Sequence, residues 1–444
     1  MYEYHILSQL KKYAKADKSF HMPGHKARGD FKARFPIAPF DVTELSYTDN
    51  LLCPSGIIDK AQKEIASIID AEQSFILTDG SSSGVLAMMY AASKHGTKIL
   101  VPRSSHQSVW NACRLFNLEP VVVDGGMHEG VILPPSVEEI EKLIVNDVTI
   151  AGLVAVSPDY YGNIAPLKEY AEILKKHSKL LLVDGAHGAH LAYGLAGYAG
   201  EYADVWVDGA HKTLPSLTQG AILSVNNLSL LSEIKEGLFL FRTTSPSFPI
   251  MASVEYGVKY IKNNPALLDE CLSAIGAFKA KCPFARYPSA DPFKLAIDCK
   301  PLGISSRTVE KELEKKGIYA ELSDGRYILF YLSPMTTAAD LNKLLSAFTA
   351  VAGNKKIKKD YVERPELPPV QRTYSYLYSL NRKYSLVPLT EAEGQMCAGN
   401  VGVAPPCVPV VVAGEIITKE AVKILSESKH VYGLENGKIR VVAK

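Results

Sequence analysis

Four polar positions follow apolar runs that are typical of buried strands, and their residue types can do chemistry together. Lys212 follows "DVWVDG" (204–209), and Asp184 ends the run "KLLLVD". His106 stands in "SSHQS", just after "KILVP", while "TDGSSSG" (78–84) joins an expected strand to an expected helix. Lysine is rarely buried unless it is paired or reactive, so a lysine at the end of a buried strand predicts a chemical role.

Each position also has an ordinary structural interpretation. The 78–84 turn offers backbone N–H groups at a helix N-terminus, which suit a phosphate, but a plain N-cap with a glycine turn reads the same way. The turn is neither a P-loop nor G-x-G-x-x-G. His106 fits a capping or solvated histidine, Asp184 a turn or N-cap residue, and Lys212 a surface loop.

Taken together, the four positions suit pyridoxal phosphate. This cofactor needs a lysine for its aldehyde, an anion beside its pyridine nitrogen and donors for its phosphate. Lys212 would supply the amine, and Asp184 would keep the ring nitrogen protonated by charge pairing. The 78–84 turn would hold the phosphate, and His106 would stack on the ring. Ligands of open α/β sheets bind beyond the carboxyl ends of the strands, where these residues are expected.

The elements that position these residues alternate between strands and helices. The expected strands are 74–78, 98–102, 119–124, 151–157, 179–185, 204–209 and 220–225. Helical periodicity separates several of them, so the sequence predicts an α/β fold with a mostly parallel sheet covered on both faces. A β-α-β-β-α pattern that starts at "PFKLAIDC" predicts a smaller α+β lobe, ferredoxin-like in kind.

The order of these patterns predicts three domains and a linker. Residues 1–262 would form an N-terminal segment and a large cofactor-binding domain, and 263–352 the small α+β domain. Residues 353–370 are charged and proline-rich, as in a linker. Residues 371–444, with Pro-Pro and glycine punctuation, would form a C-terminal domain.

Composition excludes several classes of protein. The 444 residues are 47% hydrophobic and 22% charged with a net charge of +2, which gives no electrostatic reason to expect nucleic acid or an acidic membrane as partner. No apolar run approaches a membrane span, and the N-terminus lacks the apolar region of a signal peptide. The seven cysteines are scattered without C-x-x-C, which favours a reducing cytoplasm. His187 and His190 have H-x-x-H spacing but no evident third ligand, so no metal is expected.

Six blocks carry a resemblance to a known family. They are "SFHMPGHK", "TDGSSSG", "SSHQS", "VDGAHGAHLAYG", "AHKTLPSLTQG" and "TTSPSFPIMAS". Together they resemble the ornithine/lysine/arginine decarboxylases, in the short Gram-positive form without a response-regulator-like domain. The resemblance covers almost the whole chain. It implies a fold type I, aspartate aminotransferase-like, pyridoxal phosphate enzyme that is a homodimer or higher oligomer with shared sites. The implied reaction converts arginine, lysine or ornithine to the amine and carbon dioxide, towards polyamines.

Carried over residue by residue, the resemblance makes Lys212 the Schiff-base lysine, Asp184 the partner of the ring nitrogen and His106 the stacking residue. It implies that Lys212, His106, Asp184 and His211 are catalytic. Ala186 would pack on the ring, and Thr243 would reach the phosphate from the neighbouring subunit. The implied cofactor-binding residues are Gly80, Ser81, Ser82, His106, Asp184, Ala186, His187, His211, Lys212 and Thr243.

The chain departs from the family pattern at three places. Gly185 stands where the family usually has glutamate, and Gly209 where it usually has serine, so one phosphate hydroxyl is missing. Serine at 209 is expected to tighten cofactor binding, unless the backbone there requires glycine. The C-terminal block reads "VAPPCVPVVVAGE" instead of Tyr-Pro-Pro-Gly and Pro-Gly-Glu. Two alternatives stay open: another reaction of the same cofactor, such as amino transfer, and a non-catalytic relative.

Overall fold

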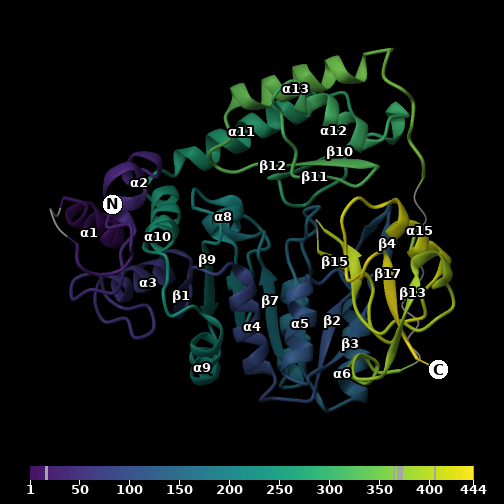
Figure 1. The fold of residues 1–444 in the computed structure, drawn as a ribbon, viewed down its shortest axis with the longest axis horizontal. Helices are drawn as coiled ribbons and strands as arrows, with labels where there is room; N and C mark the ends of the chain where they lie inside the picture. The colour runs from purple at the N-terminus through teal and green to yellow at the C-terminus, as the bar shows by residue number, and fades with distance from the viewer. Residues whose placement is uncertain (16–18, 364–365, 368–373, 405–406, 444) are drawn as a thin grey trace. The chain divides into compact units, whose positions relative to one another are not determined.

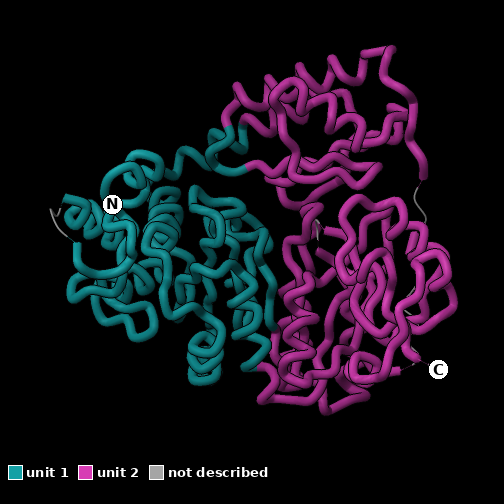
Figure 2. Tube along the Cα trace, in the orientation of Figure 1, with its two compact units in different colours: residues 1–91, 182–273, 333–336 teal, residues 92–181, 274–332, 337–444 magenta. Residues whose placement is uncertain are grey.

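The computed structural model describes residues 1–15, 19–363, 366–367, 374–404 and 407–443. The chain forms two compact units (Figure 2). Unit 1 comprises residues 1–91, 182–273 and 333–336, and unit 2 comprises residues 92–181, 274–332 and 337–444. Both alternate helices with strands, so the predicted α/β character is confirmed (Figure 1). The predicted boundaries at residues 262, 352 and 370 stay a prediction, and residues 364–365 and 368–370 of the expected linker lie outside the described residues.

Unit 1 holds four neighbouring strands of the central sheet, in the order β1-β9-β8-β7. These strands are β1 (Gln73–Leu77), β7 (Leu180–Gly185), β8 (Val205–Asp208) and β9 (Ala221–Val225). The α-helices are α1 (His5–Tyr13), α2 (Gly29–Arg34), α3 (Ile57–Ile68), α4 (Ser81–Ala92), α8 (Ala210–Thr213), α9 (Leu231–Phe241), α10 (Phe248–Asn263) and the start of α11 (Ala266–Lys281). Short 3-10 helices are η1 (Ala38–Phe40), η2 (Ala189–Tyr193), η3 (Ala199–Glu201) and η4 (Leu228–Leu230).

Unit 2 holds three more strands of the central sheet, in the order β6-β2-β3, and four smaller sheets. Its strands are β2 (Lys98–Pro102), β3 (Glu119–Val123), β4 (Met127–His128), β5 (Val131–Ile132), β6 (Ile150–Val156), β10 (Lys294–Asp298), β11 (Leu322–Ser323), β12 (Tyr327–Tyr331), β13 (Tyr384–Pro388), β14 (Val401–Val403), β15 (Val408–Val411), β16 (Val431–Tyr432) and β17 (Lys438–Val442). Its helices are α5 (Gln107–Leu115), α6 (Val137–Asn146), α7 (Leu167–Lys176), η5 (Lys300–Leu302), α12 (Ser306–Glu314), α13 (Ala338–Ala352), α14 (Tyr376–Leu380), η6 (Leu389–Glu391) and α15 (Lys419–Glu427).

The register of the central sheet agrees with the apolar runs of the sequence. β2 pairs with β3 and β6 in parallel, and β7 pairs with β8 in parallel, whereas β9 runs antiparallel to both β1 and β8. β7, β8 and β9 are buried at every position, which matches their unbroken apolar sequences. The seven predicted strands all form, each within about a residue or two of its expected ends.

The small lobe in unit 2 has an antiparallel sheet in the order β10-β12-β11, with α12 and α13 on one face (Figure 1). The second strand of the predicted β-α-β-β-α pattern is short, because β11 forms only two pairs with β12, at Leu322 and Ser323. Gly317, which precedes this strand, has a positive φ of 71°, so the chain leaves α12 through a turn rather than entering an extended strand.

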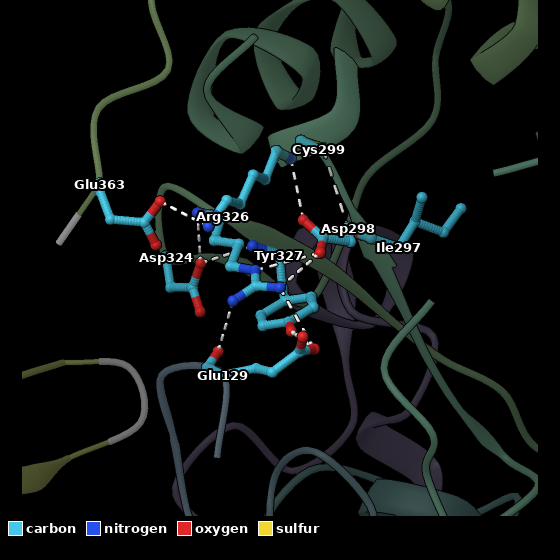
Figure 3. A network of polar contacts seen from close by, with 9 residues as sticks. Glu129, Ile297, Asp298, Cys299, Asp324, Arg326, Tyr327 and Glu363 are labelled. Carbon is cyan, nitrogen blue, oxygen red and sulfur yellow. Dashed lines mark hydrogen bonds and ion pairs between the residues drawn. The ribbon is translucent and has the colours of Figure 1, made fainter. Parts of the chain in front are cut away.

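An ion network ties the β4–β5 hairpin to this small sheet (Figure 3). The guanidinium of Arg326 donates to Asp298 at 2.8 Å and to the backbone carbonyl of Glu129 at 3.1 Å. The Tyr327 hydroxyl donates to the Glu129 carboxylate at 3.2 Å. Two partners for one planar guanidinium fix its orientation, so the network sets where the hairpin lies on the sheet.

The described residues that follow 374 pack around a core of their own. β13 pairs with β17, and β14 pairs with both β15 and β16. Apolar side chains of these strands and of α15 fill the space between them, among them Val411, Ile417 and Ile439. A separate core is consistent with the predicted C-terminal domain.

Candidate active site

Lys212 lies in the single-turn helix α8, directly after β8. Its backbone N–H donates to the carbonyl of Gly209 at 3.0 Å, so the turn begins as soon as the strand ends. The side chain is half-buried rather than fully buried as expected, and its amine lies 3.0 Å from Nε2 of His187. The lysine side chain is therefore held against a histidine at the carboxyl end of the sheet.

Asp184 stands at the carboxyl end of β7, and it is only 5% exposed. Its carboxylate accepts from the backbone N–H of Ala186 at 3.2 Å, which closes a tight turn after the strand. Ala186 and His187 are buried in this turn. A buried carboxylate with one local partner keeps free lone pairs for a further donor.

The 78–84 turn leads into α4, as predicted. The loop after α8 connects this turn to α8, the helix that carries Lys212. Gly80 has a positive φ of 77°, which glycine adopts without strain, and its N–H donates to the carbonyl of Gln219 at 2.9 Å. The next residue, Gly220, accepts from the backbone N–H of His211 at 3.0 Å. Residues 219–220 thus join the turn to α8. Ser81 is half-buried and Ser82 is exposed at the first turn of α4.

His211 and Thr243 also lie in unit 1. Nδ1 of His211 lies 2.9 Å from the carbonyl of Gly220 and donates to it, which fixes the ring on the loop after α8. The backbone N–H of Thr243 donates to Asp79 at 3.3 Å, so this threonine lies beside the 78–84 turn of its own chain. The role expected for Thr243 in a neighbouring subunit stays a prediction.

His106 belongs to unit 2, where it is the N-cap of α5. Its Nδ1 accepts from the backbone N–H of Ser108 at 3.2 Å and lies 2.8 Å from the Ser108 hydroxyl. The interpretation of His106 as a capping residue is therefore correct, because a nitrogen at the edge of its ring caps α5. The cap uses one ring nitrogen of His106, so the stacking role expected for its ring stays a prediction.

The structure gives a physical reason for glycine at position 209. Its φ is −83°, so the backbone itself would accept any residue. A side-chain carbon there would lie 2.5 Å from the backbone carbonyl oxygen of Ala186 and 3.2 Å from Cδ of Lys212. The expectation that serine at 209 would simply add a phosphate donor is therefore wrong, because the space is already filled by the Asp184 turn.

The sequence reasoning missed Asp208, the last residue of β8. This carboxyl is 2% exposed and accepts from the indole N–H of Trp206 at 3.0 Å. Burial, together with the nearby negative charge of Asp184, raises the pKa of Asp208 to about 7. The sequence does not distinguish Asp208 from an ordinary turn residue, because an aspartate at the end of a strand is common in turns.

Two further polar side chains lie in the 78–84 turn or near it. The hydroxyl of Thr78 is buried, and no partner for it exists among the described residues. Arg242 precedes Thr243, and burial lowers the pKa of its guanidinium to about 10 despite the charge of Asp79. One guanidinium nitrogen of Arg242 donates to the carbonyl of Leu51 at 3.3 Å, while the other two have no partner among the described residues. Buried polar atoms without partners are costly, so Thr78 and Arg242 mark positions where a bound polar group would add stability.

The donor set fits pyridoxal phosphate in chemical terms. An amine, a buried carboxylate and a helix N-terminus with a positive-φ glycine are gathered at the carboxyl ends of β1, β7 and β8. Lys212 would hold the aldehyde, Asp184 the ring nitrogen, and Gly80, Ser81 and Ser82 the phosphate. Within the described parts of the chain, no group of three or more His, Cys, Asp or Glu side chains is arranged to hold a metal ion.

Comparisons with known proteins agree with this chemistry. The model of the family "Orn/Lys/Arg decarboxylase, major domain" matches residues 5–285. The Bacillus subtilis protein YaaO, itself uncharacterized, is 31% identical over 94% of this chain and 92% of its own. The arginine decarboxylase of the same organism is 29% identical over 95% of this chain and 92% of its own. The lysine decarboxylase LdcF of Francisella novicida shares the fold, with a TM-score of 0.78, 20% identity and coverage of 99% of this chain and 81% of its own. The predicted fold class is thereby confirmed.

Proposed function

Because the chain belongs to the Orn/Lys/Arg decarboxylase family, we propose that it is a pyridoxal-phosphate-dependent decarboxylase of arginine, lysine or ornithine. The observation that carries the proposal is the contact of the Lys212 amine with Nε2 of His187, 3.0 Å apart, at the carboxyl end of β8. The contact holds the amine in one place at the edge of the sheet, where it would meet the aldehyde of the cofactor. The buried carboxylate of Asp184 supports the same assignment.

The cofactor, when bound, supplies an aromatic ring that accepts the electron pair left on Cα as carbon dioxide departs. The residues of the chain would then have separate tasks. Asp184 would hold a proton on the ring nitrogen by charge pairing, and His106 would cover one ring face. Lys212 or His211 would deliver the proton that replaces the carboxyl group on Cα. Burial of the turn after Asp184 would keep water from that proton transfer.

We further propose that the active form is a homodimer or a higher oligomer with shared sites. Support comes from exposed apolar side chains on residues 20–37 of unit 1, which are costly to leave in water. They are Phe20, Met22, Phe31, Phe35 and Ile37. Sedimentation of the purified protein tests this, and a monomer that retains full activity at assay concentration would contradict it.

We also place the protein in the cytoplasm. All seven cysteines are free, and five of them are buried, as expected where thiols stay reduced. In the described chain, no helix has the length and apolar content to cross a bilayer. Fractionation of cells that express the protein tests the location.

The proposed reaction is tested by measuring carbon dioxide release from arginine, lysine and ornithine with added pyridoxal phosphate. Release from at least one of them, with the matching amine as product, is expected. A keto acid instead of carbon dioxide would show amino transfer. Absence of cofactor colour and of any product would favour a non-catalytic relative and would contradict the proposal.

A further inference from the structure

The segment between β2 and α5, which carries His106, is anchored on the C-terminal part of unit 2. Arg103 begins this segment and is only 8% exposed. One guanidinium nitrogen donates to the backbone carbonyl of Val410 in β15 at 3.3 Å, and the other lies 3.6 Å from the Asp124 carboxylate. Its backbone N–H donates to the carbonyl of Val123 at 3.0 Å. A single side chain thus links the segment to β15 and to the end of β3.

The first turn of α5 is also completed by the C-terminal part. The first four N–H groups of a helix have no partner within it. His106 satisfies the second through its Nδ1, but the first, that of Gln107, donates to the backbone carbonyl of Cys407 at 2.9 Å. Cys407 precedes β15 and has a positive φ of 60°. The β14–β15 connection therefore supplies a cap that α5 cannot supply itself.

A third set of contacts fixes the middle of α5. The Trp110 indole donates to the carbonyl of Ser105 at 3.2 Å, and the Tyr376 hydroxyl lies 3.3 Å from the carbonyl of Trp110. The side-chain amide of Asn400 donates to that hydroxyl at 3.0 Å. Trp110 is fully buried, and Tyr376 is 2% exposed. The contacts are continuous from Asn400, next to β14, to Ser105, next to His106.

We propose that Arg103 is a positioning residue, through which the β14–β15 hairpin sets the position of His106. The inference rests on the proposed function, which gives His106 the face of the cofactor ring. Without contacts from other elements, the short segment between β2 and α5 would leave the imidazole several orientations, so its order has to be supplied by contacts. The C-terminal part is therefore a component of the active site, although none of its residues is assigned to chemistry.

The experiment compares three single variants, Arg103→Met, Asp124→Asn and His106→Ala. It also includes the double variant that combines Arg103→Met with His106→Ala. Asp124→Asn weakens the anchor but keeps the contact of the guanidinium with Val410. It therefore tests the anchor even if Arg103→Met does not fold. Arg440→Met is the matched control, because Arg440 belongs to β17 of the same C-terminal part and lies over the Tyr384 ring at 4.7 Å. Three quantities are measured: kcat and KM, the visible circular dichroism of bound pyridoxal phosphate, and hydrogen exchange of residues 104–110.

Arg103→Met is expected to lower kcat about tenfold or more with little change in KM, since small misplacements in an active site are that costly. It should also change the circular dichroism of the cofactor and speed exchange of the α5 N-terminus, whereas Arg440→Met should do neither. The double variant should be no slower than His106→Ala, because residues that act through one another are not additive. Multiplied losses in the double variant, or normal exchange in Arg103→Met and Asp124→Asn, would overturn the inference.

Hydrogen exchange separates this inference from the proposed function. It is measured with and without pyridoxal phosphate, so it reports the anchoring even if the protein binds no cofactor. Two results together would contradict the proposed function but support the anchor. They are a wild-type protein that binds no cofactor, and faster exchange in Arg103→Met than in wild type. Cofactor binding and turnover that are unchanged in Arg103→Met would contradict the positioning role alone.

Discussion

The amine of Lys212 lies 3.0 Å from Nε2 of His187, with the two residues on consecutive strand ends of the same sheet. The contact joins the turn after β7, which carries Asp184, to the short helix that follows β8. It therefore holds the lysine amine at the same edge of the sheet as the buried carboxylate of Asp184.

We expect Lys212→Ala to abolish turnover and to prevent fixation of the cofactor by borohydride, since no other amine has been placed at the end of β8. The measurement is the mass of the borohydride-treated protein. Lys262→Ala is the matched control, because Lys262 is an exposed lysine of α10 in the same unit. Cofactor that still becomes covalently attached to the Ala variant would remove Lys212 from this role.

We expect Asp184→Asn to keep the fold and to slow the chemical step severely. Asparagine retains an oxygen that accepts from Ala186, so the turn after β7 can form. It loses the charge that would keep the ring nitrogen protonated, which is worth about 2–3 kcal/mol, or roughly a hundredfold in kcat. Single-turnover kinetics measure the effect, with Asp204→Asn, in the loop before β8, as the control. Turnover close to that of the control would contradict the assignment.

We expect Gly209→Ser to weaken cofactor binding and to destabilise the protein. The added carbon would press on the carbonyl of Ala186 and on the Lys212 side chain, and such overpacking costs about 1–3 kcal/mol. Gly276→Ser is the control, because a side chain at Gly276 in α11 would meet no atom within 4 Å. Cofactor dissociation and thermal unfolding are measured for both. Tighter binding in Gly209→Ser would show that the turn after Asp184 moves aside at little cost.

How much of the site the sequence predicts depends on how local each signal is. The strand ends at Asp184 and Lys212 follow from unbroken apolar runs, because burial on both faces leaves little choice of structure. The sequence does not single out Lys259, which is fully buried, because the partners of its ammonium include Glu64, far away along the chain. The contact of Cys407 with Gln107 is a backbone contact, so it leaves no signal in residue type. Contacts between distant segments depend on packing that periodicity cannot describe.

The buried carboxyl of Asp208 predicts a pH dependence of stability. Its pKa is raised to about 7 in the folded protein, whereas an unfolded aspartate titrates near 4. Between these two values the folded state keeps a proton that the unfolded state has lost, so stability falls as the pH rises. The slope from this group is about 1.4 kcal/mol per pH unit. Asp159, whose pKa burial raises to about 6, adds a similar slope in wild type and variant alike.

Asp208→Asn should remove the contribution of this one group. Asparagine is neutral at every pH and still accepts from the Trp206 indole, so the variant should unfold at a higher temperature than wild type at about pH 8. The difference should shrink as the pH falls and level off below about pH 4, where the aspartate of wild type becomes protonated in the unfolded state as well. Thermal unfolding of the cofactor-free proteins across this range measures it, with Asp204→Asn as a control. A difference that stays constant with pH would mean that folding does not change the pKa of Asp208, and would contradict the prediction.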